Sequence, residues 1–157
     1  MRELPPEVAD ICHNTFGLHP KPLQLEVIRK MVKGDDCILI AGCGWGKSLV
    51  FFLPLVLWPQ SITIVISPLK ALQEEQVNKL ADVGIPRIAL KQETLITGTL
   101  FAQLANGAFQ AVFMSLELIF SSRKLCRLWE NTNWRRLLFA VIIDEAHCIS
   151  TWGTEFR

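Results

Sequence analysis

The eight residues from 41 to 48, Ala-Gly-Cys-Gly-Trp-Gly-Lys-Ser, constrain the fold more than any other part of the chain. They follow the apolar run Cys37–Ile40 and precede a second apolar run from Leu49, so the sequence predicts a strand, a glycine-rich turn and a helix in succession. Such a turn presents backbone N–H groups at the positive end of a helix and so binds phosphate chains. The strict form of this loop begins with glycine rather than alanine, and a merely structural glycine turn is the alternative interpretation.

Every residue of the turn has a predicted place in nucleotide binding. We expect its three glycines to adopt positive φ angles and to let the backbone approach a ligand closely. Lys47 would reach the β- and γ-phosphates, and the Ser48 hydroxyl would bind Mg²⁺. The residues expected to line the nucleotide site from this turn are Gly42, Cys43, Gly44, Trp45, Gly46, Lys47 and Ser48.

Two carboxylates follow another apolar run near the end of the chain. Asp144 and Glu145 come directly after Leu138–Ile143. Mg²⁺ is often held by one or two carboxylates together with phosphate oxygens, so we assign Asp144 to the metal. We assign Glu145 to general-base activation of the attacking water, and His147 to sensing the γ-phosphate. The alternative interpretation is an acidic strand end that caps the next helix.

The remaining sequence alternates strand-like and helix-like runs. The predicted strands are Cys37–Ile40, Ile62–Ile66, Arg87–Leu90, Ala111–Met114 and Leu138–Ile143. The predicted helices are Pro22–Lys33, Lys47–Leu57, Lys70–Leu80, Gly98–Asn106 and Arg123–Asn131, with Pro54 expected to kink or break the second. Continuous apolar strands between helices predict an α/β fold, an open and mostly parallel sheet flanked by helices, with ligands at the carboxyl ends of the strands.

Composition narrows the class of protein. The 157 residues fit one domain, and a net charge of +1 argues neither for nor against a nucleic-acid partner. The five cysteines are irregularly spaced without a Cys-x-x-Cys pair, so we expect no zinc site in this segment and a reducing compartment. No signal peptide is visible, and the apolar runs are shorter than the ~20 residues of a membrane span. We therefore expect an intracellular protein, nuclear if the source is a eukaryote.

A glutamine precedes the phosphate-binding turn on the helix Pro22–Lys33. The side-chain amide of Gln24 has both a donor and an acceptor, so it can pair with the edge of adenine. An ordinary polar residue at a helix start is the alternative, but the position just ahead of the strand and turn favours the adenine interpretation.

In this order, these pieces resemble the first half of a superfamily 2 helicase motor, and RecQ-type DNA helicases in particular. The matching segments are Phe16-Gly17 with Lys21–Gln24 (motif zero), Ala41 to Ser48 (motif I), Ser67–Leu72 with Gln76-Val77 (motif Ia), and Asp144–Ser150 with Trp152-Gly153 and Phe156-Arg157 (motif II and the aromatic-rich loop). The Cys-Ile-Ser-x-Trp-Gly continuation separates the chain from other DEAH-type helicases. The resemblance covers residues 14–157, which leaves 1–13 as an N-terminal extension.

The resemblance implies a RecA-like P-loop NTPase lobe that uses ATP and Mg²⁺ to drive 3′-to-5′ unwinding of DNA. Lys21 and Gln24 would bind adenine. The residues implied to contact single-stranded or duplex DNA are Ser67, Pro68, Lys70, Trp152, Phe156 and Arg157. Taken alone, Lys70 would be an ordinary surface lysine, and the two aromatic residues would more often belong to a core or a partner surface.

The chain also departs from the family pattern. Cys43 and Trp45 replace a threonine and a glycine, Lys21 replaces an arginine, and Ser115-Leu116-Glu117 stands where a proline–glutamate pair is usual. The motif III strand, the second motor lobe with its arginine finger, and the zinc and winged-helix regions are absent, so we expect an incomplete first lobe with a gap or rearranged pairing in its sheet. Such a segment should not unwind DNA alone. The alternatives are a catalytically inactive nucleotide-binding or interaction module, and a DEAH-type RNA helicase.

Overall fold

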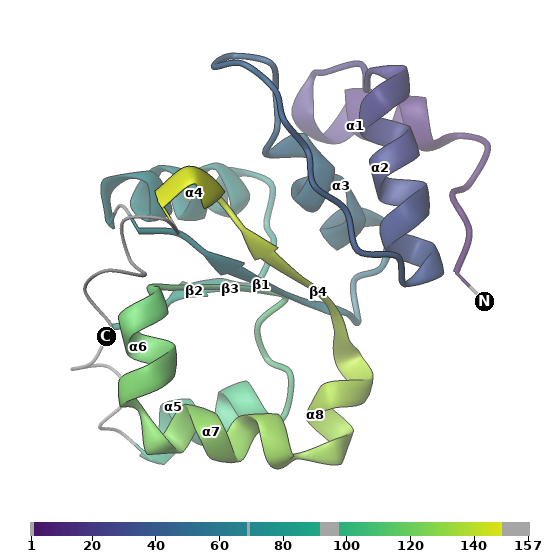
Figure 1. The fold of residues 1–157 in the computed structure, drawn as a ribbon. Coiled ribbons are helices and arrows are strands. Elements are labelled where there is room, and N and C mark those ends of the chain that lie inside the picture. Colours follow the sequence, from purple (N-terminus) through teal and green to yellow (C-terminus); the bar gives the residue numbers. More distant parts are fainter. Residues whose placement is uncertain (1, 69, 92–97, 149–157) are drawn as a thin grey trace. The chain divides into compact units, whose positions relative to one another are not determined.

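A computed structural model describes residues 2–68, 70–91 and 98–148 (Figure 1). The chain divides into two compact units, Met1–Pro59 and Gln60–Arg157. The first contains helices and the glycine-rich turn at residues 41–48, and the second contains the sheet together with further helices. Each unit has a hydrophobic cluster of its own.

Three helices build the first unit: α1 (Val8–Phe16), α2 (Pro22–Lys33) and α3 (Leu49–Leu57). Pro22 begins α2, where its missing N–H costs nothing, and Gly34 ends it in the left-handed conformation. Apolar residues from all three helices form one buried cluster: Val8, Cys12, Ile28, Leu49, Val50 and Leu53. The bounds of α2 are those predicted from the sequence. α1 was not predicted, and it runs across the boundary expected between residues 13 and 14.

The predicted strand Cys37–Ile40 is wrong, since these residues are irregular. Ile38 and Ile40 are 92% and 91% exposed. An apolar run favours burial, but it becomes a strand only where a neighbouring strand supplies hydrogen-bond partners. No described strand pairs with this segment. The following helix begins at Leu49 rather than Lys47, and it continues through Pro54 without a break.

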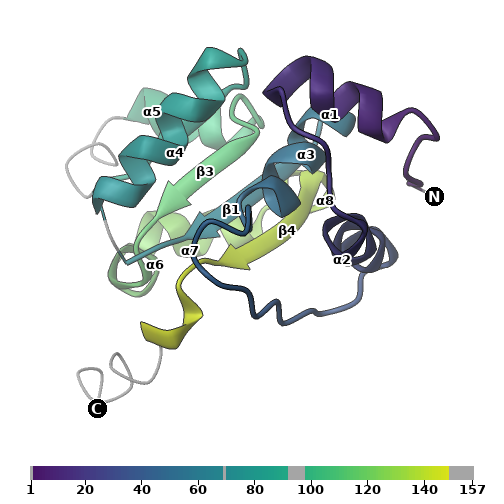
Figure 2. The same ribbon diagram turned by 90° about the horizontal axis from the view of Figure 1, so that it is seen from above.

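The second unit contains a four-stranded parallel sheet in the order β2-β3-β1-β4. Its strands are β1 (Ile62–Ile66), β2 (Arg87–Ala89), β3 (Ala111–Met114) and β4 (Leu138–Ile143). Figure 2 shows β3, β1 and β4 side by side and running in the same direction. The predicted α/β class with a parallel sheet is confirmed. Among the described strands β4 lies at one edge and no gap interrupts the sheet, and the segment 37–40 is not one of its strands.

Helices cover both faces of this sheet. They are α4 (Lys70–Asp82), α5 (Gly98–Ala105), α6 (Leu116–Ser121), α7 (Arg123–Glu130) and α8 (Thr132–Leu137), followed by a 3₁₀ turn at Ala146–Cys148. Figure 1 shows α4 on one face and the other four on the opposite face. The short helices α6 and α8 were not predicted. Ser115 and Asn131 cap them by accepting hydrogen bonds from backbone N–H groups of their first turns.

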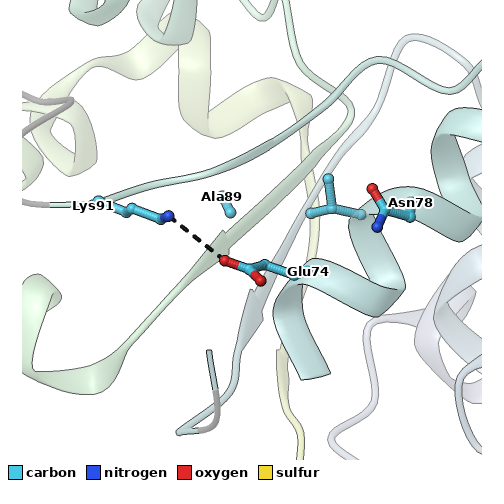
Figure 3. A pocket seen from close by; sticks show the side chains of 5 residues that line it. Glu74, Asn78, Ala89 and Lys91 are labelled. Carbon is cyan, nitrogen blue, oxygen red and sulfur yellow. Dashed lines mark ion pairs between the residues drawn. The ribbon is translucent and has the colours of Figure 1, made fainter. Parts of the chain in front are cut away.

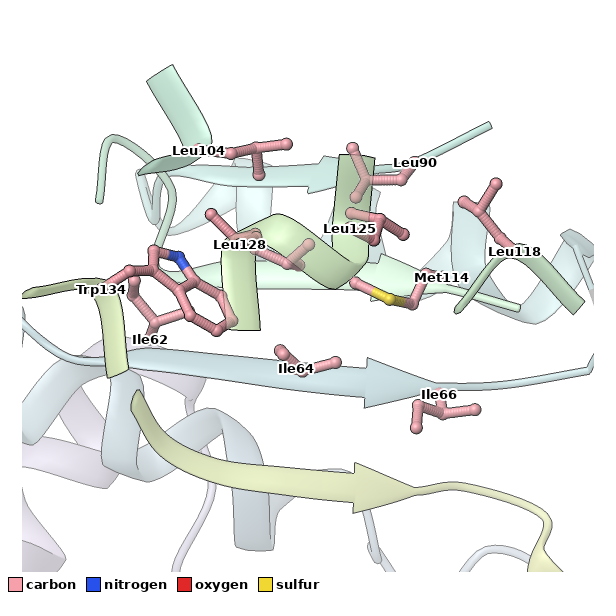
Figure 4. Packing of buried hydrophobic residues seen from close by; sticks show 11 residues of the cluster. Ile62, Ile64, Ile66, Leu90, Leu104, Met114, Leu118, Leu125, Leu128 and Trp134 are labelled. Atoms are coloured by element: carbon pink, nitrogen blue, oxygen red, sulfur yellow. The ribbon is translucent and has the colours of Figure 1, made fainter. Parts of the chain in front are cut away.

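The largest cluster of buried apolar residues lies between the sheet and α5 to α8. Ile62, Ile64 and Ile66 point to this side because side chains alternate along a strand. Figure 4 shows them packing with Met114 and with residues of the covering helices, including Trp134. This packing fixes the sheet, and the sheet in turn fixes the level at which β1 and β4 end.

Candidate nucleotide-binding site

The glycine-rich turn at residues 41–48 has a backbone suited to an anion. Gly44 and Gly46 adopt φ angles of +75° and +92°, as predicted. Gly42 does not, so the expectation of three positive φ angles holds for two glycines. The backbone N–H groups of Gly46, Lys47 and Ser48 donate no hydrogen bond within the described residues. Unpaired N–H groups beside a helix N-terminus attract a polyanion.

Lys47 lies folded against its own loop. Its Nζ donates to the carbonyl oxygens of Ala41 and Gly42 at 3.0 and 3.1 Å. These contacts hold a positive charge at the turn, where phosphate oxygens would compete for the same donors. The next residue, Ser48, stands at the N-cap of α3, yet its hydroxyl makes no capping hydrogen bond. That hydroxyl is chemically available as an oxygen ligand.

The predicted adenine-binding residues lie against this turn. Gln24 is only 2% exposed, and its Nε2 donates to the carbonyl oxygen of Gly46 at 2.9 Å. Its Oε1 accepts from the backbone N–H of Lys21 at 2.7 Å. Both ends of the amide are therefore engaged within the chain, and Gln24 supports the loop. A Cβ on Gly46 would lie 3.0 Å from the same Nε2, so φ and close approach both favour glycine there.

Trp45 contacts Lys21, the other predicted adenine-binding residue. The Nζ of Lys21 donates to the carbonyl oxygen of Trp45 at 2.7 Å and lies 4.9 Å from the centroid of its ring. This distance fits a cation–π interaction. The half-buried ring also packs against the cluster of the first unit. The bulky residue in the loop is therefore held by packing and by a lysine from the predicted adenine-binding segment.

The acidic pair lies at the end of β4. Ile143 pairs with Ile66 of β1, and the backbone N–H of Asp144 donates to the Ile66 carbonyl oxygen at 2.9 Å. The carboxylate of Asp144 accepts two hydrogen bonds. The backbone N–H of Glu145 donates to Oδ1 at 3.0 Å, and Nε2 of Gln76 donates to Oδ2 at 2.9 Å. The carboxylate is thus held from two sides.

Glu145 has an unusual backbone conformation. Its φ is +54°, the only positive value found for a non-glycine residue in the described part of the chain. Residues in sparsely populated regions of φ and ψ cost about 1–3 kcal/mol and tend to cluster at functional sites. Its Oε2 lies 3.2 Å from Nδ1 of His147, so the predicted catalytic residues Asp144, Glu145 and His147 are neighbours.

The predicted DNA-binding residues differ in their surroundings. Ser67 follows β1 and is fully buried, and its Oγ has no hydrogen-bond partner among the described residues. That hydroxyl therefore does not face solvent in this conformation. Lys70 begins α4 and is exposed, and Pro68 is half-buried. Trp152, Phe156 and Arg157 lie outside the described residues.

Two buried glutamines of α4 were not assigned roles from the sequence. Gln76 holds Asp144 as described above, and Nε2 of Gln73 donates to the carbonyl oxygen of Ser67 at 2.7 Å. The sequence offered one signal: Gln76 lies in the segment that resembles motif Ia. Its partner could not be known before β1 and β4 were seen to be adjacent.

A surface hollow lies between α4 and β2. Glu74, Val77, Asn78, Ala89 and Lys91 line it, and Lys91 pairs with Glu74 at 3.6 Å (Figure 3). None of the predicted site residues lines this hollow. We therefore assign it no part in nucleotide binding.

The described residues also show what this part of the chain lacks. No group of three or more His, Cys, Asp and Glu side chains is arranged to hold a metal ion there. None of the helices in that part of the chain combines the length and apolar character that a membrane span needs.

Comparison with known proteins identifies the class. Residues 21–157 match the family model of the DEAD/DEAH box helicases, so the chain belongs to this family. It is 37% identical over 156 residues to the RecQ-like DNA helicase BLM of Xenopus laevis, covering 96% of this chain and 11% of that protein. It is 34% identical to the ATP-dependent helicase wrn-1 of Caenorhabditis elegans, covering 98% of this chain and 14% of that protein.

A yeast relative gives the same picture. The chain is 33% identical over 160 residues to the ATP-dependent helicase SGS1 of Saccharomyces cerevisiae, covering 96% of this chain and 11% of that protein. The chain therefore spans a small part of the length of the curated relatives it matches. The resemblance to RecQ-type helicases inferred from the motifs is confirmed by these relatives.

Proposed function

We propose that this chain is the ATP-binding motor segment of an ATP-dependent 3′-to-5′ DNA helicase of the RecQ type. The observation that carries the proposal is the turn before α3: the backbone N–H groups of Gly46, Lys47 and Ser48 donate no hydrogen bond within the described residues, and the ammonium of Lys47 lies against the carbonyl oxygens of the same loop. Such a turn suits a phosphate chain. The relatives named RecQ-like or ATP-dependent helicases support the choice of activity and of DNA. In a eukaryote we expect the whole protein to act in the nucleus.

The donor set fits Mg²⁺. Each carboxylate oxygen of Asp144 accepts one hydrogen bond and keeps further lone pairs, and the Ser48 hydroxyl is not used as a helix cap. Mg²⁺ prefers oxygen ligands and usually keeps several waters. In this proposal Ser48 and Asp144 are metal ligands, Glu145 is the general base, and His147 senses the γ-phosphate. Bound Mg²⁺ would neutralise charge on the phosphates.

Other residues complete the proposed assignment. Lys21 and Gln24 serve the adenine end of the nucleotide, which requires the Gln24 amide to give up its contacts with Gly46 and the Lys21 backbone. The turn from Gly42 to Ser48 serves the phosphates. DNA phosphates and bases contact Ser67, Pro68, Lys70, Trp152, Phe156 and Arg157. For Ser67 this requires a local movement, because its side chain is buried. Residues 14–157 form part of the motor domain after a short extension, and a second RecA-like lobe completes the working helicase.

The direct test is binding of a fluorescent ATP analogue to this chain. Charged hydrogen bonds contribute about 1.5–3 kcal/mol each, so Lys47→Ala should weaken binding by about tenfold to a hundredfold. The matched control is Lys33→Ala, which removes an exposed lysine of the same unit and should leave affinity unchanged. Equal affinity in the Lys47→Ala and wild-type chains would refute the proposal. Strand separation is expected only from a longer protein.

Trp45 and Cys43 favour one second candidate, a catalytically inactive nucleotide-binding module with the same fold. The discriminating measurement is DNA-stimulated phosphate release from a chain extended through a second lobe. Stimulation that is lost in Glu145→Gln supports a motor, and no stimulation supports the module. Stronger stimulation by RNA than by DNA would instead indicate a DEAH-type RNA helicase.

A further inference from the structure

Gln76 makes one specific contact, and that contact is with the acidic pair. The residue lies in the middle of α4 and is 6% exposed. Its Nε2 is 2.9 Å from Oδ2 of Asp144. An ionised carboxylate only accepts hydrogen bonds, so the amide must present its donor end to Asp144. Chemistry therefore fixes the orientation of the Gln76 side chain.

The oxygen of the Gln76 amide makes no hydrogen bond within the described residues. This atom, Oε1, is buried. A buried acceptor without a partner destabilises a fold, and an apolar side chain of similar shape would avoid that cost. A glutamine at this position is therefore explained by its bond to Asp144 rather than by packing.

A second glutamine on the same helix contacts the neighbouring strand. Gln73 is 5% exposed, and its Nε2 donates to the carbonyl oxygen of Ser67 at 2.7 Å. Residues three apart in a helix lie on the same side. The two strands end at the same level, since Ile66 pairs with Ile143. Thus α4 holds the ends of β1 and β4 through two adjacent buried amides.

The start of α4 carries the exposed Lys70, which the proposed function assigns to DNA phosphates. Lys70 and Gln76 are 6 residues apart on one continuous helix. A shift of the helix start toward a phosphate would therefore also move the donor that holds Asp144. A rigid element with contacts at both places is a physical route for coupling.

We propose that Gln76 is a positioning residue that sets the orientation of the Asp144 carboxylate for the metal, and that α4 couples this orientation to DNA bound at Lys70. The inference rests on the proposed function. Partners that orient metal ligands typically change metal affinity by about 10- to 100-fold when they are removed. Gln73 has the same burial and chemistry but no contact with Asp144, so it offers a matched control.

The test measures Mn²⁺, a spectroscopically visible substitute for Mg²⁺, by electron paramagnetic resonance. Mn²⁺ is titrated into the full chain saturated with ADP. In Gln76→Leu the midpoint should rise by about 10- to 100-fold, while Gln73→Leu should stay within about threefold of wild type. A merely structural role would lower the amount of Mn²⁺ bound at saturation in both variants without a selective shift of the midpoint. Equal midpoints in Gln76→Leu and wild type would overturn the inference.

Two additional variants test the inference if Gln76→Leu does not fold or affects Mn²⁺ binding by another route. If Gln76→Leu does not fold, Gln76→Met replaces it with an unbranched side chain of similar length. In an Asp144→Asn background the substitution at Gln76 should have no further effect, since effects of residues in contact are not additive. A full additional loss there would contradict the proposed route through Asp144.

The coupling is measured with the same titration in the presence of an oligothymidylate. In wild type the single strand should change the Mn²⁺ midpoint by about fivefold or more, and in Gln76→Leu by less than twofold. An unchanged wild-type midpoint would overturn the coupling. A wild-type chain that does not bind ADP would instead refute the proposed function, which separates the two failures.

Discussion

At the scale of single residues, Glu145 combines an acidic side chain with a left-handed backbone. An L-residue in this region costs about 1–2 kcal/mol, and glycine avoids most of that cost. We predict that the free energy of unfolding of Glu145→Gly is about 1 kcal/mol higher than that of Glu145→Ala. Urea denaturation measures both values. A glutamate kept there is consistent with a role other than stability.

The comparison of two variants at one position controls for the lost side chain, since both remove the carboxylate and its contact with His147. Equal stability of the two variants would show that the backbone at residue 145 is not held at positive φ in solution.

Cys12 is a second residue whose surroundings make a prediction. Burial raises the pKa of the Cys12 thiol. The unfolded chain therefore loses this proton at a lower pH than the folded chain does. The stability that comes from the neutral thiol is present below the unfolded pKa and is lost as the pH rises through the folded pKa. Cys12→Ala should make the alkaline decline in the free energy of unfolding shallower.

Thiol labelling checks the same point independently. Cys37, Cys43 and Cys126 are exposed, so a thiol reagent should modify them in the folded chain well before Cys12. Mass spectrometry can follow each cysteine separately. Modification of Cys12 at the rate of Cys43 would contradict its burial.

At the scale of elements, the segment 37–40 and the strand β1 have similar apolar sequences but different surroundings. Ile64 is fully buried between the sheet and its helices, whereas Ile38 is exposed. We predict that Ile64→Ala lowers the free energy of unfolding by about 2–5 kcal/mol and that Ile38→Ala lowers it by less than about 0.5 kcal/mol. A loss above about 2 kcal/mol for Ile38→Ala would mean that the predicted strand forms after all.

The comparison of residues 37–40 with β1 also shows which parts of the fold can be predicted from the sequence. The bounds of α2, β1, β3 and β4 follow from apolar runs and from Pro22 and Gly34, because these signals are local. The fate of residues 37–40 is not local, since a strand requires a partner elsewhere in the chain. The helices α6 and α8 are short, and only their caps at Ser115 and Asn131 mark them.

In the candidate site, too, local sequence signals can be predicted and contacts between distant residues cannot. The loop around Lys47 and the acidic pair after β4 are recognisable from residue type and spacing. The contacts of Gln24 with Gly46, and of Gln76 with Asp144, join residues that are 22 and 68 positions apart. The burial of Ser67 likewise depends on packing around β1 rather than on its own sequence neighbourhood.

At the scale of the whole molecule, the proposed residues for one nucleotide are distributed over two compact units. Lys47 and Ser48 belong to Met1–Pro59, and Asp144 belongs to Gln60–Arg157. The chain matches a helicase family over residues 21–157, a range that includes all three residues. The proposal therefore predicts that substitutions of Lys47, Ser48 and Asp144 each weaken binding of the same magnesium nucleotide.

The most direct measurement is the gain in unfolding free energy on adding Mg-ADP. A ligand at about 100 times its dissociation constant should stabilise the wild-type chain by about 2.7 kcal/mol. Lys47→Ala and Asp144→Asn should each lose about half of this gain or more. The double variant should lose little more than either, because both residues act on the same ligand. Full stabilisation of Asp144→Asn by Mg-ADP would contradict the account.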